Sequence, residues 1–342
     1  MNYQRLGRSG LLVSSLCLGT MIFGEESERG TPPAEAERII SRFLDAGGNF
    51  IDTADVYAGG RSEEIVGQAI KGKRDQVVVA TKVRFSPQKG PNDSGLSRQH
   101  ILSAIDASLH RLQTDYIDVY YMHAWDALTP LEESLRVFDD LVRAGKVRYI
   151  GVSNFKAWQV MKALALSDAS HWARYVAAQY QYSLVNREIE DELCDLCPSE
   201  GIGITAWGPL GGGFLSGKYQ RNKRPQVATE GRIATTGGDT EEAWERRNTE
   251  RNWVVLETVQ DIAQAHSATI AQIALAWLRT QPSVSSVILG IRTLSQLEEN
   301  LPAATLELTA EERSRLDRVS MPPERYPYRL IELWRRRVED HQ

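Results

Sequence analysis

Three short apolar runs, each closed by an ionisable residue, constrain this chain more than any other feature of its sequence. The runs with their closing residues are Phe50 to Asp52, Val77 to Lys82 and Ile117 to His123. If these runs are consecutive parallel strands, their carboxyl ends lie at one rim, where the acid, the ammonium and the imidazole converge. Tyr57 follows Asp52 by five residues, in a turn-like segment, and is expected at the same rim. We predict that Asp52, Tyr57, Lys82 and His123 form an active site.

The rest of the chain repeats a strand, a loop and a helix. Runs such as Val77-Val78-Val79-Ala80 are apolar on successive residues, which is typical of strands buried on both faces. A hairpin is predicted at 3–14, and strands at 16–19, 50–52, 77–81, 117–122, 149–152, 176–179, 203–207 and 284–289. Helices are predicted to begin at Thr31-Pro32, Ser62, Ser97, Thr129 (with a capping box to Glu132), Phe155, Glu188, Arg251, Thr269, Thr293 and Thr309.

Strands that alternate with helices build a parallel sheet, either a closed eight-stranded barrel or an open doubly wound sheet. An open sheet that binds dinucleotides carries Gly-x-Gly-x-x-Gly after its first strand, whereas here Gly19 is followed by Thr-Met-Ile-Phe-Gly. We therefore predict an α/β fold of the (β/α)8 TIM-barrel class, one domain over residues 1–342, with a C-terminal helical extension. The connection 208–250 exceeds the length of an ordinary loop, about 12–15 residues.

Composition and charge exclude several classes of protein. The chain is 42% hydrophobic and 25% charged, as ordinary globular proteins are, and its formal net charge of -5 argues against a nucleic-acid binder. No apolar run approaches the roughly 18 residues of a membrane helix, and the polar start lacks the apolar segment of a signal peptide. We predict a cytoplasmic protein with neither a nucleic-acid nor a membrane partner.

Cys194 and Cys197 form a Cys-x-x-Cys pair, which has two interpretations. Such a pair can act in redox chemistry or bind a metal ion, but here no second pair and no nearby histidine completes four zinc ligands. Cysteine also buries readily as a small apolar residue, and the pair lies in the predicted helix 188–200. We favour the structural interpretation and predict no metal site.

The four polar residues at the rim suit proton transfer to a carbonyl oxygen. A free tyrosine titrates near pH ~10, too high for an efficient acid at neutral pH. An adjacent cation stabilises the phenolate, so Lys82 is expected to lower the pKa of Tyr57, with Asp52 as the counter-ion of the lysine. His123, as a hydrogen-bond donor, can orient and polarise the carbonyl. Each residue alone also has a structural interpretation, and it is their joint pattern that favours catalysis.

These four residues resemble the catalytic tetrad of the aldo-keto reductase superfamily. The resemblance covers the chain from Leu6 to Asn300 and is strongest for the bacterial and potassium-channel β-subunit-like branches. It is carried by Asp-Thr-Ala-x-x-Tyr at 52–57, Lys82 after a valine-rich strand, Asp-Tyr-Ile-Asp at 115–118 before His123, Gly-Val-Ser-Asn at 151–154 and Gly-Ile-Arg at 290–292. It implies an NADPH-dependent reductase that reversibly converts aldehydes or ketones to alcohols, with the hydride from NADPH and the proton from Tyr57.

The resemblance also implies how NADPH is held. Ser153, Asn154 and Gln179 match the residues that bind the nicotinamide carboxamide, and Trp207 stands where the family places an aromatic residue, usually tyrosine, for stacking. Arg292 precedes a helix N-terminus, which is an anion site suited to the 2′-phosphate, although Thr293-x-x-Gln296 is also a capping-box pattern. The predicted cofactor contacts are Gly19, Thr20, Met21, Asp52, Ser153, Asn154, Gln179, Trp207, Gly208, Pro209, Leu210, Gly211, Gly212, Lys218, Gly290, Arg292, Gln296, Glu299 and Asn300.

Residues 212–218 spell most of a P-loop, Gly-Gly-Phe-Leu-Ser-Gly-Lys. The next residue is Tyr219, which cannot bind magnesium as Ser or Thr does, and no helix follows, so a nucleoside-triphosphate site is disfavoured. In the resembled family this loop folds over the pyrophosphate, with the main chain of Pro209 to Gly212 and the side chain of Lys218 in contact. We predict that 208–250 is a cofactor-covering loop.

Phe23, Phe85 and Trp125 lie just past three of the predicted strands and are candidates to line an apolar pocket for an aldehyde or ketone substrate. Two other functions stay open. One is an NADPH-binding redox-sensing or auxiliary subunit with slow turnover, and the other is a barrel isomerase or aldolase that uses Lys82 as a Schiff base. The fold is compatible with a monomer and with a homo-oligomer.

Overall fold

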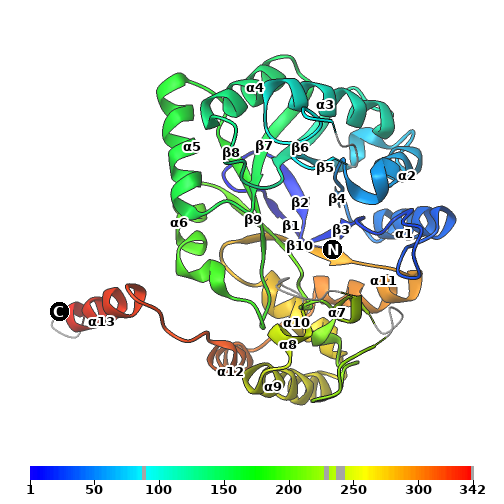
Figure 1. Ribbon diagram of the computed structural model, residues 1–342. Coiled ribbons are helices and arrows are strands. Elements are labelled where there is room, and N and C mark those ends of the chain that lie inside the picture. Colours follow the sequence, from blue (N-terminus) through cyan, green and yellow to red (C-terminus); the bar gives the residue numbers. More distant parts are fainter. Residues whose placement is uncertain (87–89, 227–230, 236–242, 340–342) are drawn as a thin grey trace.

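The computed structural model describes residues 1–86, 90–226, 231–235 and 243–339, and its centre is a closed barrel of parallel strands (Figure 1). In barrel order the strands are β3 (Leu16–Gly19), β4 (Phe50–Asp52), β5 (Val78–Val83), β6 (Ile117–Met122), β7 (Val147–Ser153), β8 (Tyr175–Gln181), β9 (Gly203–Trp207) and β10 (Val284–Gly290), and β10 pairs with β3. The predicted TIM-barrel class is confirmed. Because every strand is parallel, all eight carboxyl ends lie at one rim.

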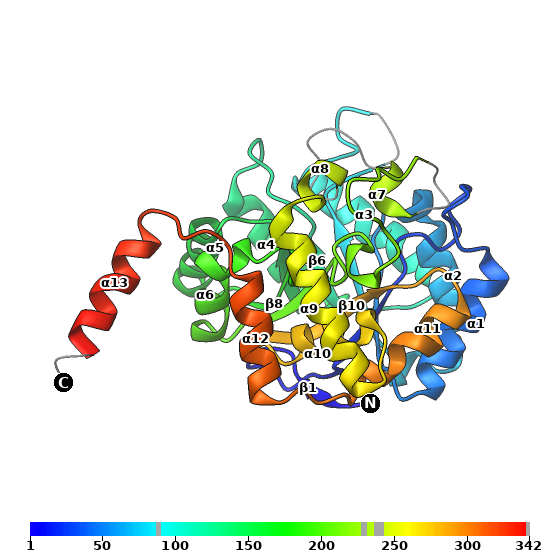
Figure 2. The same ribbon diagram turned by 90° about the horizontal axis from the view of Figure 1, so that it is seen from below.

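Helices lie around this barrel, and the last of them projects away from it (Figures 1 and 2). They are α1 (Pro33–Asp45), α2 (Arg61–Ala69), α3 (Arg98–Leu112), α4 (Leu131–Arg143), α5 (Ala157–Ser170), α6 (Leu193–Ser199), α7 (Arg232–Thr235), α8 (Trp244–Arg247), α9 (Glu250–His266), α10 (Ile270–Arg279), α11 (Leu294–Asn300), α12 (Ala310–Ser320) and α13 (Tyr328–Glu339). The 3-10 turns are η1 (Tyr57–Gly60), η2 (Arg74–Gln76), η3 (Glu188–Asp191), η4 (Phe214–Ser216) and η6 (Leu301–Ala304).

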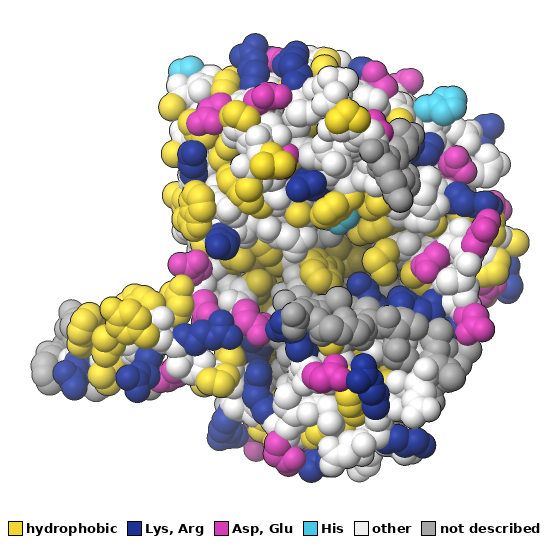
Figure 3. All heavy atoms as spheres, in the orientation of Figure 1, with side chains coloured by type: hydrophobic (Ala, Val, Ile, Leu, Met, Phe, Trp, Pro, Cys, Tyr) yellow, Lys and Arg dark blue, Asp and Glu magenta, His cyan; other side chains and the backbone are white. Residues whose placement is uncertain are grey.

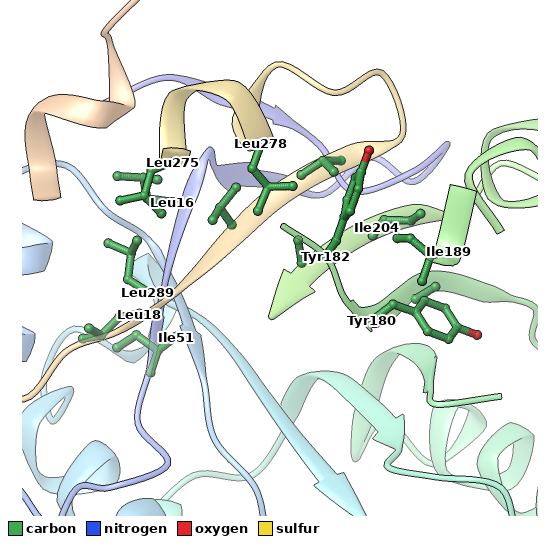
Figure 4. Close-up of a cluster of buried hydrophobic side chains, with 14 of the residues drawn as sticks. Leu16, Leu18, Ile51, Tyr180, Tyr182, Ile189, Ile204, Leu275, Leu278 and Leu289 are labelled. Atoms are coloured by element: carbon green, nitrogen blue, oxygen red, sulfur yellow. The ribbon is translucent and has the colours of Figure 1, made fainter. Parts of the chain in front are cut away.

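Alternate residues of the strands fill two separate cores, because successive side chains point to opposite faces of a sheet. On β3, Leu16 and Leu18 belong to the core between the strands and the helices, whereas Cys17 belongs to the core inside the barrel. Figure 4 shows Leu16 and Leu289 of β10 beside Leu275 of α10. Both faces of the strands are therefore buried, as the continuous apolar runs predicted.

An N-terminal hairpin closes one end of the barrel. Strands β1 (Tyr3–Arg5) and β2 (Leu12–Ser14) pair antiparallel, as predicted for 3–14. Leu6 and Val13 are fully buried in the inner core, and β1 lies at the opposite end of the barrel from α7 and α8 (Figure 2). The other end, where the strands finish, is left for a functional site.

Two of the predicted threonine N-caps are wrong, and the capping box predicted at Thr293 is incomplete. The N-cap of α1 is Pro32, and the Thr31 hydroxyl instead donates to the Arg292 carbonyl oxygen at 3.0 Å. The N-cap of α4 is Pro130, because the Thr129 hydroxyl donates to Asp126 at 2.8 Å. Both threonines therefore hold loops of the rim rather than helix ends. At α11, Thr293 does cap the Gln296 N–H, but the Gln296 side chain accepts from the Arg292 N–H at 2.9 Å, so the predicted box is only half formed.

The continuous helix predicted at 188–200 is also wrong. The segment is the 3-10 turn η3 followed by α6, with a break at Glu192, whose backbone angles (φ -145°, ψ -43°) are not helical. Glu190 accounts for this break, because its carboxylate accepts hydrogen bonds from Tyr182 at 2.5 Å and from Arg187 at 2.7 Å. Side-chain contacts to other elements therefore outweigh the local helical pattern.

The Cys194–Cys197 pair lies on α6. Both thiols are free, Cys197 is fully buried, and burial raises the pKa of Cys194 to about 11 and that of Cys197 to about 12. A thiol with such a pKa is poorly reactive at neutral pH. Across the described ranges, no cluster of three His, Cys, Asp or Glu side chains could hold a metal ion, and no helix is long and apolar enough to cross a membrane.

Candidate active site

The barrel brings the four predicted catalytic residues to one rim. Asp52 is the last residue of β4, Lys82 lies near the end of β5, and His123 directly follows β6. Tyr57 begins η1, which connects β4 to α2. Because β4 pairs with β5 and β5 with β6, three neighbouring strands supply the acid, the amine and the imidazole.

A continuous chain of hydrogen bonds links three of these side chains. The Lys82 ammonium is fully buried and donates to Asp52 Oδ1 at 2.6 Å, to the Thr53 carbonyl oxygen at 2.7 Å and to the Tyr57 hydroxyl oxygen at 3.1 Å. An ammonium has three donors, so all of them are used here. Gln179 Nε2 donates to the other carboxylate oxygen of Asp52 at 2.7 Å. The acid and the amine are thus held in one arrangement.

The charge of Lys82 is maintained by its two partners. Burial alone would lower the pKa of the ammonium, because a buried charge loses its hydration. Asp52 and Tyr57 have the opposite effect, and the pKa of Lys82 is raised above its usual value. Lys82 therefore remains a cation at neutral pH, directly beside the phenol oxygen.

The expected net lowering of the pKa of Tyr57 is not found. Burial raises the pKa of this phenol, and Asp52 adds to the rise, whereas Lys82 acts in the predicted direction through its charge and its hydrogen bond. The effect of burial is the larger one. Tyr57 is consequently a neutral phenol at physiological pH. It therefore carries the proton that a general acid donates.

His123 is neutral in this site. Burial and then the neighbouring Lys82 charge lower the pKa of His123 to about 3. Its ring is edge-on to the rings of Tyr57 and Phe85, with centroids 5.9 Å and 5.1 Å away. Its Nδ1 is buried and has no hydrogen-bond partner among the described residues. A neutral imidazole offers one donor and one acceptor, so it can bind a carbonyl oxygen without adding a charge.

Behind Tyr57 lies a second buried acid that the sequence reading did not single out. The Asp55 side chain is 7% exposed, and its Oδ1 makes no hydrogen bond to the described residues. Burial and then Glu63 raise the pKa of Asp55 to about 8, against the opposing charge of Arg111. Glu63 itself is fully buried and accepts from Arg111 Nε at 2.7 Å and from Thr81 Oγ1 at 2.5 Å.

We expect Asp55→Asn to flatten the dependence of stability on pH. Between about pH 4 and pH 8 the folded chain keeps a proton on Asp55 that the unfolded chain releases, so stability falls as pH rises through this window. The free energy of unfolding of the variant minus that of wild type should therefore increase with pH in this window, by up to about 1.4 kcal/mol per pH unit. Urea unfolding at pH 5, 7 and 9 measures it, with the exposed acid Asp75→Asn as control. If the free energies of unfolding of wild type and Asp55→Asn changed with pH in the same way, Asp55 would not be protonated in the folded protein.

The ends of β7 and β8 present a rigid polar patch. The Ser153 hydroxyl donates to the Gln179 carbonyl oxygen at 2.8 Å. Asn154 Nδ2 donates to the Ser153 hydroxyl oxygen and to the His123 carbonyl oxygen, both at 2.9 Å. The backbone of Asn154 has a φ of 56°, in the left-handed region that asparagine tolerates better than most residues. The three predicted carboxamide ligands therefore lie together beside the tetrad.

A cavity of about 450 Å³ opens above this patch. Tyr57 and His123 line it, whereas Lys82 lies behind Tyr57. The predicted cofactor residues that line it are Gly19, Thr20, Met21, Asp52, Ser153, Asn154, Gln179, Trp207, Gly208, Pro209, Leu210, Gly212, Lys218, Gly290, Arg292, Gln296 and Asn300. Gly211 and Glu299 do not. A Cβ on Gly211 would be 2.5 Å from the Val185 side chain, so Gly211 faces the body of the protein, whereas Glu299 is exposed to solvent on α11.

Several lining residues were missed by the sequence reading. They are Ile22, Arg29, Gly213, Gly231, Arg232, Leu275, Ile288 and Leu289. Arg29 and Arg232 come from irregular or short segments far apart in the chain, so no local pattern marked them. Leu275, Ile288 and Leu289 are buried core residues that also line the cavity. Only the closed barrel brings these residues to one wall.

One end of the cavity is strongly cationic. Arg29, Lys218 and Arg292 line this end, and Arg232, whose charge acts on Tyr57, also lines the cavity. Burial and then the charges of Arg292 and Arg29 lower the pKa of Lys218, which shows that the three like charges lie close together. A bound anion would relieve this repulsion. This end of the cavity therefore has the charge and the donors of a phosphate site.

The aromatic residues predicted for the substrate pocket have three different positions. Phe23 is fully buried in the core between strands and helices and does not line the cavity. Phe85 is 41% exposed and touches the edge of His123. Trp125 packs edge-on against Phe155, with centroids 5.1 Å apart. Phe85 thus stays next to the tetrad, and Trp125 packs a loop onto α5.

Comparison with known proteins supports this geometry. The sequence profile of the family described as "Aldo/keto reductase family" matches residues 15–321. The chain is 38% identical over 315 residues to "Probable voltage-gated potassium channel subunit beta" of Arabidopsis thaliana, covering 89% of this chain and 91% of that protein. It is 38% identical over 322 residues to "Uncharacterized oxidoreductase YrpG" of Bacillus subtilis (strain 168), covering 91% and 93%.

A third relative carries a named enzymatic activity. The chain is 33% identical over 349 residues to "Versiconal hemiacetal acetate reductase" of Aspergillus parasiticus, which covers 96% of this chain and 99% of that protein. These matches span nearly the whole barrel, including every strand end described above. The chain therefore belongs to the aldo/keto reductase family of oxidoreductases.

Proposed function

We propose that this protein is an NADPH-dependent carbonyl reductase that converts an aldehyde or a ketone to an alcohol, reversibly. One observation carries the proposal: the buried Asp52–Lys82–Tyr57 chain ends in a neutral phenol that faces a cavity with a cationic end. When bound, NADPH supplies a hydride. The protein supplies the proton and the orientation.

The residues of the cavity fit NADPH. Its volume lies in the range of small-molecule sites, about 300–1,000 Å³. Ser153, Asn154 and Gln179 offer amides and a hydroxyl for the carboxamide, and Trp207 offers an aromatic face for the nicotinamide. Gly212 and Gly213 have positive φ and no Cβ, so the main chain can approach a pyrophosphate closely there. The cations of the far end suit the 2′-phosphate.

The proton has a defined origin in this proposal. The Tyr57 O–H donates to the carbonyl oxygen as negative charge develops there, and the phenolate that remains is stabilised by the Lys82 ammonium 3.1 Å away. Asp52 keeps that ammonium charged and fixed. The neutral His123 ring donates a hydrogen bond that orients the carbonyl towards Tyr57. The resulting phenolate regains its proton from solvent through the open cavity.

The test is NADPH oxidation across a panel of sugar aldehydes, methylglyoxal-like aldehydes and bulky ketones. Turnover with any member supports the proposal, and the best member identifies the substrate class. Failure to bind NADPH would contradict the cofactor assignment. An aldolase or isomerase acting through Lys82 would instead be trapped by borohydride with a sugar phosphate, but Lys82 is buried behind Tyr57 and does not line the cavity, which disfavours it.

An auxiliary subunit that binds NADPH with slow turnover is the second candidate. It is favoured by the similarity to a protein named as a potassium-channel β subunit. The same panel separates the two functions, because a sensor would bind NADPH tightly and hardly oxidise it. The cofactor-covering role of 208–250 stays a prediction, since 227–230 and 236–242 lie outside the described residues.

We expect Arg292→Ala to weaken the preference for NADPH over NADH. Loss of a charge-assisted contact to the 2′-phosphate should raise the KM for NADPH about 10-fold to 100-fold, while the KM for NADH changes little, because NADH lacks that phosphate. Steady-state kinetics with both cofactors measure this. Arg315→Ala, which removes an exposed arginine paired with Asp261, is the control. If the KM values for NADPH and NADH rose equally, Arg292 would not contact the 2′-phosphate.

A further inference from the structure

The C-terminal helix α13 projects from the barrel with its apolar side chains uncovered (Figures 1 to 3). Tyr326, Ile331, Leu333 and Trp334 are 82%, 56%, 43% and 57% exposed. Leu330, Ile331 and Trp334 recur at helical spacing and form one stripe. Among the described elements, none packs along this helix. An isolated helix of 12 residues is at best marginally stable in water, so α13 needs a surface to pack on.

The start of α13 is tied to the barrel, and this fixes the direction in which the helix leaves. Arg325 pairs with Asp191 of η3 at 3.8 Å, and the Tyr328 side chain is hydrogen-bonded to Glu192. From this anchor the helix extends away from α5 and α6 (Figures 1 and 2). To cover its own barrel, the helix would have to reverse at 321–327 and lose both contacts. A surface on another molecule can be reached with both contacts kept.

The same chain carries a second uncovered apolar surface, on α5. Trp158 and Met161 are 57% and 41% exposed and lie three residues apart, on one face of the helix, with the exposed Ala165 one turn further on. The opposite face of α5 holds the buried Val160 and Leu164, so the helix is apolar on two sides. A helix that is apolar all round is normally covered on both sides. The outer face of α5 therefore lacks its cover.

Basic side chains accompany α13, and acidic side chains lie beside α5, which itself also exposes Lys162 next to Met161. Exposed Arg329, Arg335 and Arg337 accompany the apolar stripe of α13. Next to α5, the surface of η3 and α6 exposes Glu188, Glu192 and Asp195. Basic side chains on α13 of one molecule can thus pair with acids around α5 and α6 of another. Charges at the edge of an interface favour one relative orientation of the two molecules over others.

We propose that two copies of this chain exchange their α13 helices in a twofold-symmetric dimer, with the apolar stripe of each α13 packed on the outer face of the other copy's α5. Both surfaces lie on the same side of the barrel, so a single twofold axis beside α6 brings each helix to the other barrel. In such an isologous arrangement every contact occurs twice, so two short helices supply a dimer interface. The tetrad does not take part, although Trp158 packs against the rim residue Trp125, with ring centroids 6.0 Å apart.

The oligomeric state tests the proposal. Light scattering coupled to gel filtration should give a mass near twice the 38.3 kDa of one chain. Trp334→Glu and Met161→Glu should each raise the dimer dissociation constant at least about 10-fold to 100-fold, because each buries a carboxylate in an apolar contact. Val254→Glu, which changes an equally exposed apolar residue of α9, should leave the dimer intact. Matching circular dichroism and unfolding midpoints show that each variant folds.

Mixed cross-linking identifies the surface that α13 covers. When a Met161→Cys chain is mixed with a differently tagged Trp334→Cys chain, a disulfide should form between the two differently tagged chains. A wild-type sample measures any disulfide formed by the natural cysteines. A disulfide within the double-substituted chain alone, with a monomeric mass, would show that α13 folds onto its own α5 and would overturn the proposal. A monomer that binds phosphatidylserine vesicles through Trp334 would overturn it in favour of a lipid surface.

Discussion

Replacing Tyr57 by phenylalanine should reduce the rate of carbonyl reduction by about 100-fold to 10,000-fold, the usual contribution of a general acid. The substitution removes one oxygen atom, which receives a hydrogen bond from Lys82 at 3.1 Å, and leaves the ring that contacts His123. The cavity keeps its polar patch and its cationic end, because Tyr57 contributes to neither. NADPH should therefore still bind, with a dissociation constant within a few-fold of the wild-type value.

The measurement is NADPH oxidation with the best substrate of the panel, run beside a fluorescence titration of NADPH binding. Tyr3→Phe is a matched control, because it removes the hydroxyl of an exposed tyrosine at the far end of the barrel. Unchanged turnover in Tyr57→Phe would show that the proton comes from another group. Loss of NADPH binding together with turnover would show that Tyr57 supports the site structurally rather than as an acid.

The second large effect is expected from Lys82→Met, which should lower the free energy of unfolding by about 3–5 kcal/mol at pH 7. The substitution leaves the Asp52 carboxylate buried at 3% exposure, with Gln179 as its one remaining side-chain partner among the described residues. A charge in that position loses its hydration and its counter-ion together. Replacing both residues, as Lys82→Met with Asp52→Leu, should recover most of the loss, because no uncompensated charge then remains.

Urea unfolding of the two single variants and the double variant gives the coupling free energy between the residues. Lys146→Met is the control, since Lys146 pairs with Asp106 at 2.5 Å but both side chains are largely exposed. Lys146→Met should lower the free energy of unfolding by only about 0–1 kcal/mol. Equal losses for Lys82→Met and Lys146→Met would mean that burial of the Asp52–Lys82 pair contributes little. All of these Lys82 and Asp52 variants should also be catalytically impaired, because Lys82 stabilises the phenolate of Tyr57.

The barrel and the tetrad could be predicted from the sequence because both depend on regular spacing. Apolar runs that end in Asp52, Lys82 and His123 report burial on both faces of successive strands, and parallel strands must end at one rim. Arg292 was placed by the same logic, at the start of the helix that follows β10. These residues belong to segments in which local pattern and tertiary fold agree.

Other features depended on contacts between segments far apart in the chain. Arg29, from an irregular segment, and Arg232, at the start of α7, reach the cavity from positions far apart in the chain. Phe23 is buried in the core although its position resembles that of a pocket residue. The pKa of Tyr57 is raised rather than lowered because the effect of burial exceeds that of Lys82, and burial follows only from the closed barrel. Thr31 and Thr129 hold loops of the rim instead of capping helices.

The sequence by itself determined the strand and helix order, the barrel class, the family and the four residues of the tetrad, because periodicity and spacing are local properties of the chain. Only the tertiary structure decided which side chains line the cavity, which acids are buried, which caps form, and that α13 stands uncovered beside a barrel whose α5 is also uncovered. Burial and electrostatics arise from the packing of distant segments. They cannot be predicted from a pattern of residues that are neighbours in the sequence.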